Sequence, residues 1–245
     1  MRSETAFDAV RDRIRQIEAS GRTAHGTLPF GVDAIDMRLP RGGLALGALH
    51  EVAGGGAVDG AAAALFTAGI MARTTGQILW FVTRRDLFAP ALAQAGLHPD
   101  RVIYAEVGDE TSVLTYFEEA LRHGGMGGVV GEVAKLSMTA SRRLQLAAEV
   151  SGTLAIAVRR WRRMTEACDF GQPTASVTRW RVTALPSALL PVPGIGRPRW
   201  LVELIRARAG ECADMIVEAC DETGRLAVSA DMADRSLATN LRRVA

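Results

Sequence analysis

Residues 39–62 read Leu-Pro-Arg-Gly-Gly-Leu-Ala-Leu-Gly-Ala-Leu-His-Glu-Val-Ala-Gly-Gly-Gly-Ala-Val-Asp-Gly-Ala-Ala. An apolar run from Ala48 to Ala53 is followed by glycines and then by small residues, an order that predicts a strand, a tight loop and a helix. Gly55 and Gly60 have the spacing of the phosphate-binding loop G-x-x-x-x-G-K-[ST], in which the lysine contacts the β- and γ-phosphates and the hydroxyl binds Mg²⁺. The stretch therefore has the frame of such a loop.

The two positions that carry the chemistry of such a loop hold Ala61 and Ala62, which have neither an ammonium nor a hydroxyl group. If the frame starts one residue earlier, at Gly54, the second glycine is replaced by Asp59 and the next residues are again small. The carboxylate of Asp59 also places negative charge where a polyphosphate would lie, and like charges repel. We therefore expect a loop that keeps its frame without the nucleotide chemistry.

Composition indicates one globular α/β domain with appendages, because 48% of the 245 residues are hydrophobic and 23% are charged. The formal net charge of +2 does not suit a molecule that binds polyanions over its whole surface. No apolar run reaches the length of a transmembrane span, and no apolar signal region follows the first residues. We expect a cytoplasmic protein without a membrane partner.

Cysteine and histidine spacing does not suggest a metal centre. The three cysteines, Cys168, Cys212 and Cys220, show no C-x-x-C spacing, and the four histidines do not pair at metal-ligand spacing. No local arrangement suggests a Ser/His/Asp or Cys/His nucleophile. We therefore expect no metal, no cofactor and no catalytic residue.

The chain divides into three parts. Residues 1–26 hold an amphipathic helix, predicted over residues 4–20, and a linker; residues 27–229 form the α/β core; residues 230–245 form a tail. In the core, predicted strands alternate with predicted helices, which indicates a parallel sheet covered on both faces. The strands are 48–53, 77–82, 101–106, 127–130 and 153–158, and the helices are 61–74, 87–96, 110–123 and 139–150.

The pattern changes after residue 160. Two predicted strands, 176–182 and 199–206, are joined by a proline-rich turn, and 214–220 and 225–229 can add short strands. The sequence therefore predicts an antiparallel extension of the sheet. In the tail, apolar residues recur at helical spacing beside arginines, which suits a short helix that folds onto a partner; disorder without function is the alternative. The residues of this candidate partner helix are Leu237, Leu241, Arg242 and Arg243.

Four segments, taken in order, resemble the RecA superfamily. Residues 28–36 are similar to the G-x-x-x-L-D segment ahead of the RecA phosphate loop, and residues 39–54 resemble its lead-in GG-L-P-x-G-x-x-x-E-I-x-G. Residues 175–182 and 199–206 resemble its late antiparallel strands. The resemblance implies a RecA-like, mostly parallel sheet flanked by helices with a C-terminal antiparallel extension. Within the superfamily it points to the ImuA family of bacterial damage-induced mutagenesis cassettes, with the cell-division inhibitor SulA as a more distant relative.

Set against the superfamily, three ATPase positions are altered. The phosphate loop lacks its lysine and hydroxyl, as described above. The strand that should end in a Mg²⁺-associated Asp has Gly131 at that position and Glu132 one residue later, and Arg85 stands close to the position of the general base. ATP hydrolysis needs the base, the metal and the phosphate clamps together. Their joint loss predicts a protein that does not hydrolyse ATP.

A cluster of arginines around a tryptophan follows the last parallel strand, where RecA proteins place a DNA-contacting loop. It can contact single-stranded DNA through phosphates and base stacking, or hold an acidic partner with the tryptophan as an anchor. It can equally be a solvated strand end with the tryptophan in the core. The cluster consists of Arg159, Arg160, Trp161, Arg162 and Arg163.

Two further charged pairs have simpler interpretations. Arg84 and Arg85 end a central strand, where they can bind an anion or an interface, or pair with acids such as Asp86. Glu118 and Glu119 are adjacent, so on a helix they point about 100° apart, and we expect both to be solvated.

The resemblance implies a non-catalytic adaptor in SOS-induced, error-prone translesion synthesis. Its partners would be an ImuB-type Y-family polymerase homologue and, through it, a DnaE-type error-prone polymerase, together with RecA or single-stranded DNA. Two alternatives remain open at this point: a SulA-type inhibitor of cell division, and a divergent ATP-binding RecA-like enzyme.

Overall fold

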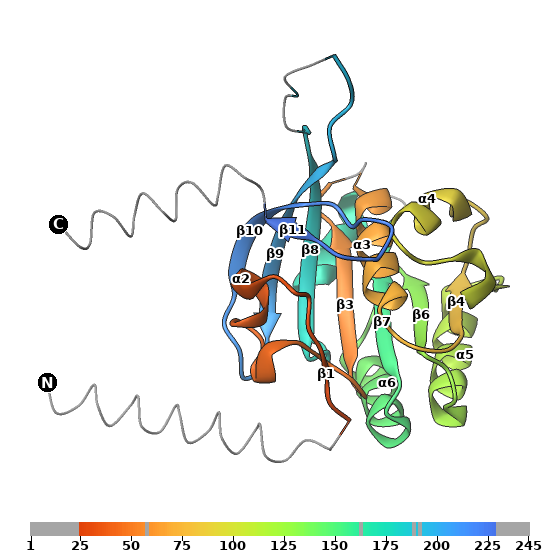
Figure 1. The fold of residues 1–245 in the computed structure, drawn as a ribbon. Helices are drawn as coiled ribbons and strands as arrows, with labels where there is room; N and C mark the ends of the chain where they lie inside the picture. The colour runs from red at the N-terminus through yellow and green to blue at the C-terminus, as the bar shows by residue number, and fades with distance from the viewer. Residues whose placement is uncertain (1–24, 57–58, 162–163, 188–189, 191–192, 229–245) are drawn as a thin grey trace, which may run out of the picture.

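The computed structural model describes residues 25–56, 59–161, 164–187, 190 and 193–228 (Figure 1). Nine strands form one sheet in the order β11-β10-β9-β8-β3-β7-β6-β4-β5, and a two-strand ribbon pairs β1 with β2. The predicted helix over residues 4–20 and the candidate partner helix with Leu237, Leu241, Arg242 and Arg243 lie outside the described residues. The predicted domain boundaries therefore stay predictions.

The parallel half of the sheet follows the predicted alternation of strands and helices. Every neighbouring pair from β3 to β5 runs parallel. The strands are β3 (Leu49–Gly54), β4 (Ile78–Val82), β5 (Val102–Glu106), β6 (Gly128–Val133) and β7 (Leu154–Arg159). Their carboxyl ends meet at one edge, which is where such sheets place ligand sites.

Two helices pack on each face of this parallel half, so the predicted covered sheet is confirmed. The first core cluster contains side chains of α3 (Gly60–Ala72) and α4 (Ala89–Gln94), and the second contains side chains of α5 (Glu110–His123) and α6 (Met138–Ser151). Because side chains alternate along a strand, successive residues of β7 face different clusters. Ile156 and Val158 belong to the first cluster, whereas Ala155 and Ala157 belong to the second.

The antiparallel extension is also confirmed. β8 (Thr178–Leu185) runs parallel to β3 and joins the two halves, and β9 (Arg199–Ala207) pairs antiparallel with β8. β10 (Ala213–Glu218) and β11 (Ala227–Val228) continue the antiparallel order to the far edge. The paired ends of β8 and β9, out to Leu185 and Arg199, extend beyond the neighbouring strands (Figure 1).

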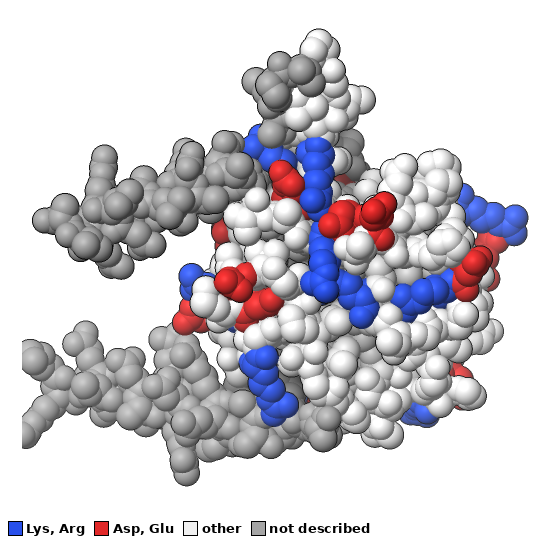
Figure 2. Space-filling model, in the orientation of Figure 1, with Lys and Arg blue, Asp and Glu red and all other residues white. Residues whose placement is uncertain are grey.

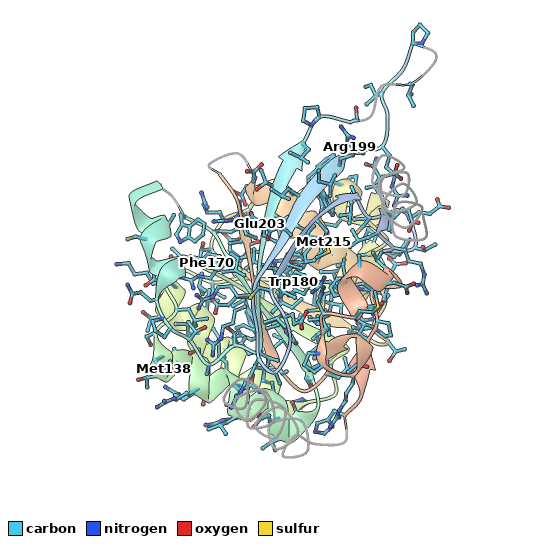
Figure 3. The ribbon with its side chains drawn as sticks, turned by 90° about the vertical axis from the view of Figure 1, so that its left-hand side faces the viewer. Met138, Phe170, Trp180, Arg199, Glu203 and Met215 are labelled. Atoms are coloured by element: carbon cyan, nitrogen blue, oxygen red, sulfur yellow. The ribbon has the colours of Figure 1, made fainter. Side chains whose placement is uncertain are left out.

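An aromatic cluster holds the N-terminal part of the core against α3 and the antiparallel strands. The ring of Phe66 from α3 lies 5.8 Å from the ring centroids of both Phe30 and Trp180, and 6.3 Å from that of Trp200. Trp180 lies in the interior of the molecule (Figure 3). Phe30 is positioned by the carboxylate of Asp36, which accepts a hydrogen bond from the Phe30 backbone N–H at 2.7 Å.

The remaining described elements are short. β1 (Thr27–Leu28) pairs with β2 (Leu44–Ala45), and α2 (Asp33–Asp36) and the 3-10 turn η1 (Pro40–Gly42) lie between them in the chain. No helix in the described part of the chain is long and apolar enough to cross a membrane.

Candidate functional site

The loop between β3 and α3 holds a carboxylate of the chain itself. Asp59 is only 5% exposed, and its Oδ1 accepts a hydrogen bond from the backbone N–H of Ala184 at 3.1 Å. A Cβ atom built on Gly56 would lie 3.1 Å from Oδ2 of Asp59, and one built on Gly55 would lie 3.4 Å from it. The carboxylate therefore lies between the loop glycines and β8, beside the start of α3, where a phosphate-binding helix would receive its anion.

The same loop is packed tightly against β8. The backbone N–H of Gly55 donates to the carbonyl of Val182 at 3.0 Å, and a Cβ atom on Gly55 would lie 1.9 Å from Oγ1 of Thr183. A Cβ atom on Gly54 would lie 2.7 Å from the backbone carbon of Asp59. These glycines are thus required by close packing between the loop and β8.

The structure brings the predicted loop residues together at the junction of β3 and α3. Gly54 ends the strand and Gly60 begins the helix, with Ala61 exposed and Ala62 buried in the first turn. Neither alanine can donate to a phosphate or ligate Mg²⁺, because a methyl group has no hydrogen-bonding capacity. The charge that the loop does contain is the negative charge of Asp59.

At the end of β6, Gly131 occupies the position predicted for a metal-binding acid, and it faces the side of the sheet covered by α5. A Cβ atom on Gly131 would lie 2.5 Å from the ring of Phe117 on α5, so this position has no room for a side chain. Glu132 faces the α3 side instead, where it is 2% exposed. Its Oε1 accepts from Nε1 of Trp80 at 3.1 Å, and its Oε2 accepts from Nη1 of Arg160 at 2.8 Å.

Arg160 links the ends of β4, β6 and β7. Its guanidinium donates to both oxygens of Asp86, each at 2.8 Å, in addition to Glu132. Such bidentate pairing is among the stronger hydrogen-bonding geometries in proteins. Both carboxylates at this edge are therefore already engaged with an arginine, which leaves a closed cluster of charges instead of an open set of ligands.

The two carboxylates respond to this cluster in opposite ways. Burial raises the pKa of Glu132, and this effect exceeds the lowering by Arg160 and by the hydrogen bond from Trp80. Burial also acts to raise the pKa of Asp86, but the hydrogen bonds and charge of Arg160 hold its pKa below the ordinary value. Opposed shifts in neighbouring groups are common at functional sites and in structural ion networks alike.

Glu132→Gln is expected to remove a pH-dependent loss of stability. Because the pKa of Glu132 is raised in the folded state, its contribution is complete below the ordinary value of 4.5 and declines as pH rises through the raised pKa. Urea unfolding between about pH 4.5 and pH 8 measures this decline in the unchanged protein. The glutamine keeps an acceptor for Trp80 and has no charge, so its profile should be flatter. Identical profiles would contradict the prediction.

Arg159 points into the protein and is only 1% exposed. Its Nη1 donates to Oε2 of Glu51 at 2.7 Å, and its Nη2 donates to the carbonyl of Ala134 at 2.7 Å and to Asp169. Glu51 is itself fully buried, and its other oxygen accepts from Ser176 Oγ at 2.6 Å. Arg159 therefore belongs to a buried ion network that links β3 and β7 to the segment after β7.

A second arginine fixes that following segment. Nη1 of Arg179 on β8 donates to the carbonyl of Phe170 at 2.6 Å, and its Nη2 donates to the carbonyl of Gln172 at 2.9 Å and to Glu51 at 3.2 Å. The guanidinium lies over the Phe170 ring, 5.1 Å from its centroid. Phe170 is the second-last residue of the 3-10 segment η3 (Met164–Gly171) and is 8% exposed. The network thus anchors the segment that follows the arginine cluster.

Within the arginine cluster, these contacts correct the prediction for Arg159. Arg159 cannot contact DNA or a partner at the surface, because its guanidinium is buried against Glu51 and Asp169. Arg160 is engaged with two carboxylates, and Trp161 is half-buried, with its ring 5.7 Å from Phe170 and its Nε1 donating to the Ala134 carbonyl at 3.1 Å.

For the other two arginines, Arg162 and Arg163, the predicted contact stays a prediction, because both lie outside the described residues.

The other charged pairs also take partners. Arg84 lies 3.9 Å from Asp86 and Arg85 forms an ion pair with Glu106, as the pairing interpretation predicts. The prediction for Glu118 is wrong: it is 5% exposed and forms ion pairs with Arg122 at 2.6 Å and Arg143 at 2.5 Å. Within the described ranges, no group of histidine, cysteine and carboxylate side chains could hold a metal ion.

Comparison with known proteins supports both the fold and the family. No family model matches the sequence. Two curated relatives are each called Protein ImuA and come from Caulobacter vibrioides, strains NA1000 / CB15N and ATCC 19089 / CB 15. Each is 39% identical in an alignment of 215 residues, and the alignment covers 83% of this chain and 87% of the relative. The crystal structure of the RadB recombinase aligns with a TM-score of 0.54 at 19% identity, over 82% of this chain and 99% of that one, which supports the RecA-like fold. The chain belongs to the ImuA family.

Proposed function

We propose that this protein is a non-catalytic RecA-like adaptor in SOS-induced, error-prone translesion DNA synthesis. Membership of the ImuA family supports a role in damage-induced mutagenesis. The observation that carries the non-catalytic part is the buried carboxylate of Asp59, which lies inside the loop that would hold phosphates and is fixed there by the backbone N–H of Ala184. The protein therefore acts by binding other macromolecules.

The surroundings of the loop support the same proposal. Hydrolysis by a RecA-type enzyme requires a base or water-positioning group, a metal and cationic phosphate clamps. Near the position of the base the chain has Arg85, which pairs with Glu106. The acid nearest to the metal position, Glu132, is tied to Trp80 and Arg160. Both of these residues are thus engaged within the protein.

The proposed partners follow from the family. An ImuB-type Y-family polymerase homologue is held directly, and a DnaE-type error-prone polymerase joins through it. RecA or single-stranded DNA is contacted through Arg162 and Arg163. On the face drawn in Figure 2, basic side chains are interspersed with acidic ones, which favours specific protein contacts over a broad polyanion surface.

The purified protein is expected not to bind ATP with Mg²⁺, even at millimolar nucleotide, and to form a complex with the purified ImuB-type homologue. Isothermal titration calorimetry measures both interactions on the full chain. ATP binding in this range would contradict the non-catalytic proposal and favour the divergent ATP-binding enzyme. The absence of a complex with the ImuB-type homologue would contradict the adaptor proposal.

The cellular role has its own test. In a strain of the host that lacks the gene, damage-induced mutation frequency should fall to the uninduced level, and the unchanged gene should restore it. A SulA-type inhibitor would instead arrest division when it is overproduced, and the purified protein would bind the division GTPase. Normal induced mutagenesis in the deletion strain would contradict the proposed function.

A further inference from the structure

The chain leaves the two outermost parallel strands toward opposite faces of the sheet. β4 and β5 end side by side, with Val82 opposite Glu106 in the register. After β4 the chain continues to α4, which packs in the first core cluster, and after β5 it continues to α5, which packs in the second. Figure 1 shows α4 and α5 at this end of the sheet. Connections that diverge in this way leave a crevice at the carboxyl ends of the strands, where open α/β sheets bind ligands.

A cavity of about 350 Å³ lies in this crevice. Its apolar lining comes from Val82 at the end of β4, from Leu87 and Ala89 where α4 begins, and from Tyr104 on β5. Tyr104 is opposite Trp80 in the register, so its ring lies on the side of the sheet that α4 covers. A largely apolar lining and a volume between about 300 and 1,000 Å³ are typical of ligand sites.

The rest of the lining is charged, and one of its arginines has no hydrogen-bond partner among the residues that the structure describes. Arg85 forms an ion pair with Glu106. Arg84 approaches only Asp86, at 3.9 Å, and both oxygens of that carboxylate already accept from Arg160 at 2.8 Å. The guanidinium of Arg84 is therefore the positive charge that the cavity offers to a ligand.

The surroundings of the cavity suit a protein partner better than a polyanion. Phe88 lies in the chain between Leu87 and Ala89 and is 68% exposed. Exposed aromatic surface of this kind is typical of interfaces between proteins. A nucleic acid needs a track of several basic side chains, whereas here the carboxylate of Glu106 lines the same cavity and repels phosphates. A single carboxylate with an apolar neighbour fits both parts of the lining.

We propose that this crevice binds a peptide segment of a partner protein in which a carboxylate side chain stands next to an aliphatic one. The aliphatic side chain fills the apolar part of the cavity, and the carboxylate pairs with Arg84. The site is separate from the degenerate phosphate loop, because β7 and β6 lie between β3 and β4 in the sheet.

Two capped dipeptides serve as probes: acetyl-Leu-Glu-amide and its neutral counterpart acetyl-Leu-Gln-amide. Chemical-shift changes in NMR titrations of the full chain measure their binding, including dissociation constants in the millimolar range. The charged peptide should bind about tenfold more tightly, since only its carboxylate pairs with Arg84. Added salt should weaken the charged peptide and leave the neutral one unchanged, because salt screens an exposed ion pair.

Three variants locate the site. Arg84→Gln should lower the affinity for the charged peptide to that for the neutral one, because the distinguishing charge is gone. Ala89→Leu adds bulk at the cavity and should weaken both peptides about tenfold. The control Arg38→Gln removes an exposed arginine between α2 and η1 that pairs with Glu211, and it should bind both peptides within about twofold of the unchanged protein.

Thermal unfolding separates a lost site from a lost fold. Arg84→Gln and Arg38→Gln should unfold at the same temperature as the unchanged protein, because the side chains of both arginines are more than a third exposed. The decisive comparison is therefore between two stable variants, and it does not depend on the stability of Ala89→Leu.

Loss of the preference for the charged peptide in Arg84→Gln, with Arg38→Gln unchanged, supports the site. The proposal is overturned if neither peptide binds at millimolar concentration, or if the unchanged protein binds both equally. Binding of a fluorescent oligothymidylate that Arg84→Gln abolishes would replace the peptide by a nucleic acid. None of these assays contains the ImuB-type homologue, so each outcome leaves the adaptor proposal to its own test.

Discussion

Replacement of Arg159 by alanine is expected to lower the free energy of unfolding by about 3–5 kcal/mol. The reason is the buried carboxylate that it leaves behind. Glu51 is fully buried, and its Oε2 accepts from Arg159 at 2.7 Å. Removal of the guanidinium also leaves the carbonyl of Ala134 and the carboxylate of Asp169 without this donor. A buried charge without its partner is among the costliest defects that a single substitution can create.

Urea unfolding at pH 7 measures this effect, with an exposed ion pair as the control. Arg38 pairs with Glu211 at 2.5 Å, and both side chains are about half exposed, so Arg38→Ala should cost less than about 1 kcal/mol. A double-mutant cycle between Arg159 and Glu51 separates their coupling from lost packing. A loss below about 1 kcal/mol for Arg159→Ala would mean that Arg179, Thr174 and Ser176 satisfy Glu51 without it.

Phe66→Ala is expected to have a destabilising effect of similar size, about 3–5 kcal/mol. Phe66 is fully buried and its ring contacts Phe30, Trp180 and Trp200. Its removal leaves a cavity between α3 and the antiparallel strands, and such a cavity costs stability in addition to the lost apolar burial. Because α3 begins at the degenerate phosphate loop, this packing also positions that loop.

Phe88→Ala is the matched control. Phe88 is 68% exposed at the start of α4, so its removal should change the free energy of unfolding by no more than about 0.5 kcal/mol. Phe66→Leu, which keeps most of the apolar volume, should lie between the control and Phe66→Ala. Equal stability of Phe66→Ala and Phe88→Ala would show that the aromatic cluster does not hold α3 against the sheet.

The order of the secondary structure could be predicted because each buried element has a simple local pattern. Within the strand predicted over 77–82, the run Ile78 to Val82 is continuously apolar, as a strand covered on both faces must be, and β4 spans Ile78–Val82. The helix predicted over 110–123 begins and ends as expected, since Asp109 caps its first turn by accepting from the Ser112 backbone N–H. The bounds of β8 were predicted less well: it starts at Thr178 and runs on to Leu185, because pairing with β9 extends it.

The candidate site was harder to predict because it depends on which way side chains turn. Four of the five residues from Arg159 to Arg163 are arginines, so the sequence does not distinguish them. In the structure, the alternation of side chains along β7 directs Arg159 toward the side of the sheet covered by α5 and α6. The sequence did contain one signal of this, the acidic Glu51 inside an apolar strand, which requires a buried partner. By contrast, no local pattern shows that Asp59 is fixed by β8, since Ala184 is 125 residues away in the chain.

The position of the Asp59 carboxylate has a consequence for how long the complexes of this protein last. RecA-type ATPases can change state when the γ-phosphate is lost, so hydrolysis sets a time limit on their assemblies. On the proposed function, a chain whose own carboxylate lies in this loop has no such step. The fraction of bound partner then follows from the concentration of the protein and its dissociation rate alone. Such a protein is regulated by how much of it the cell makes and degrades, and not by nucleotide turnover.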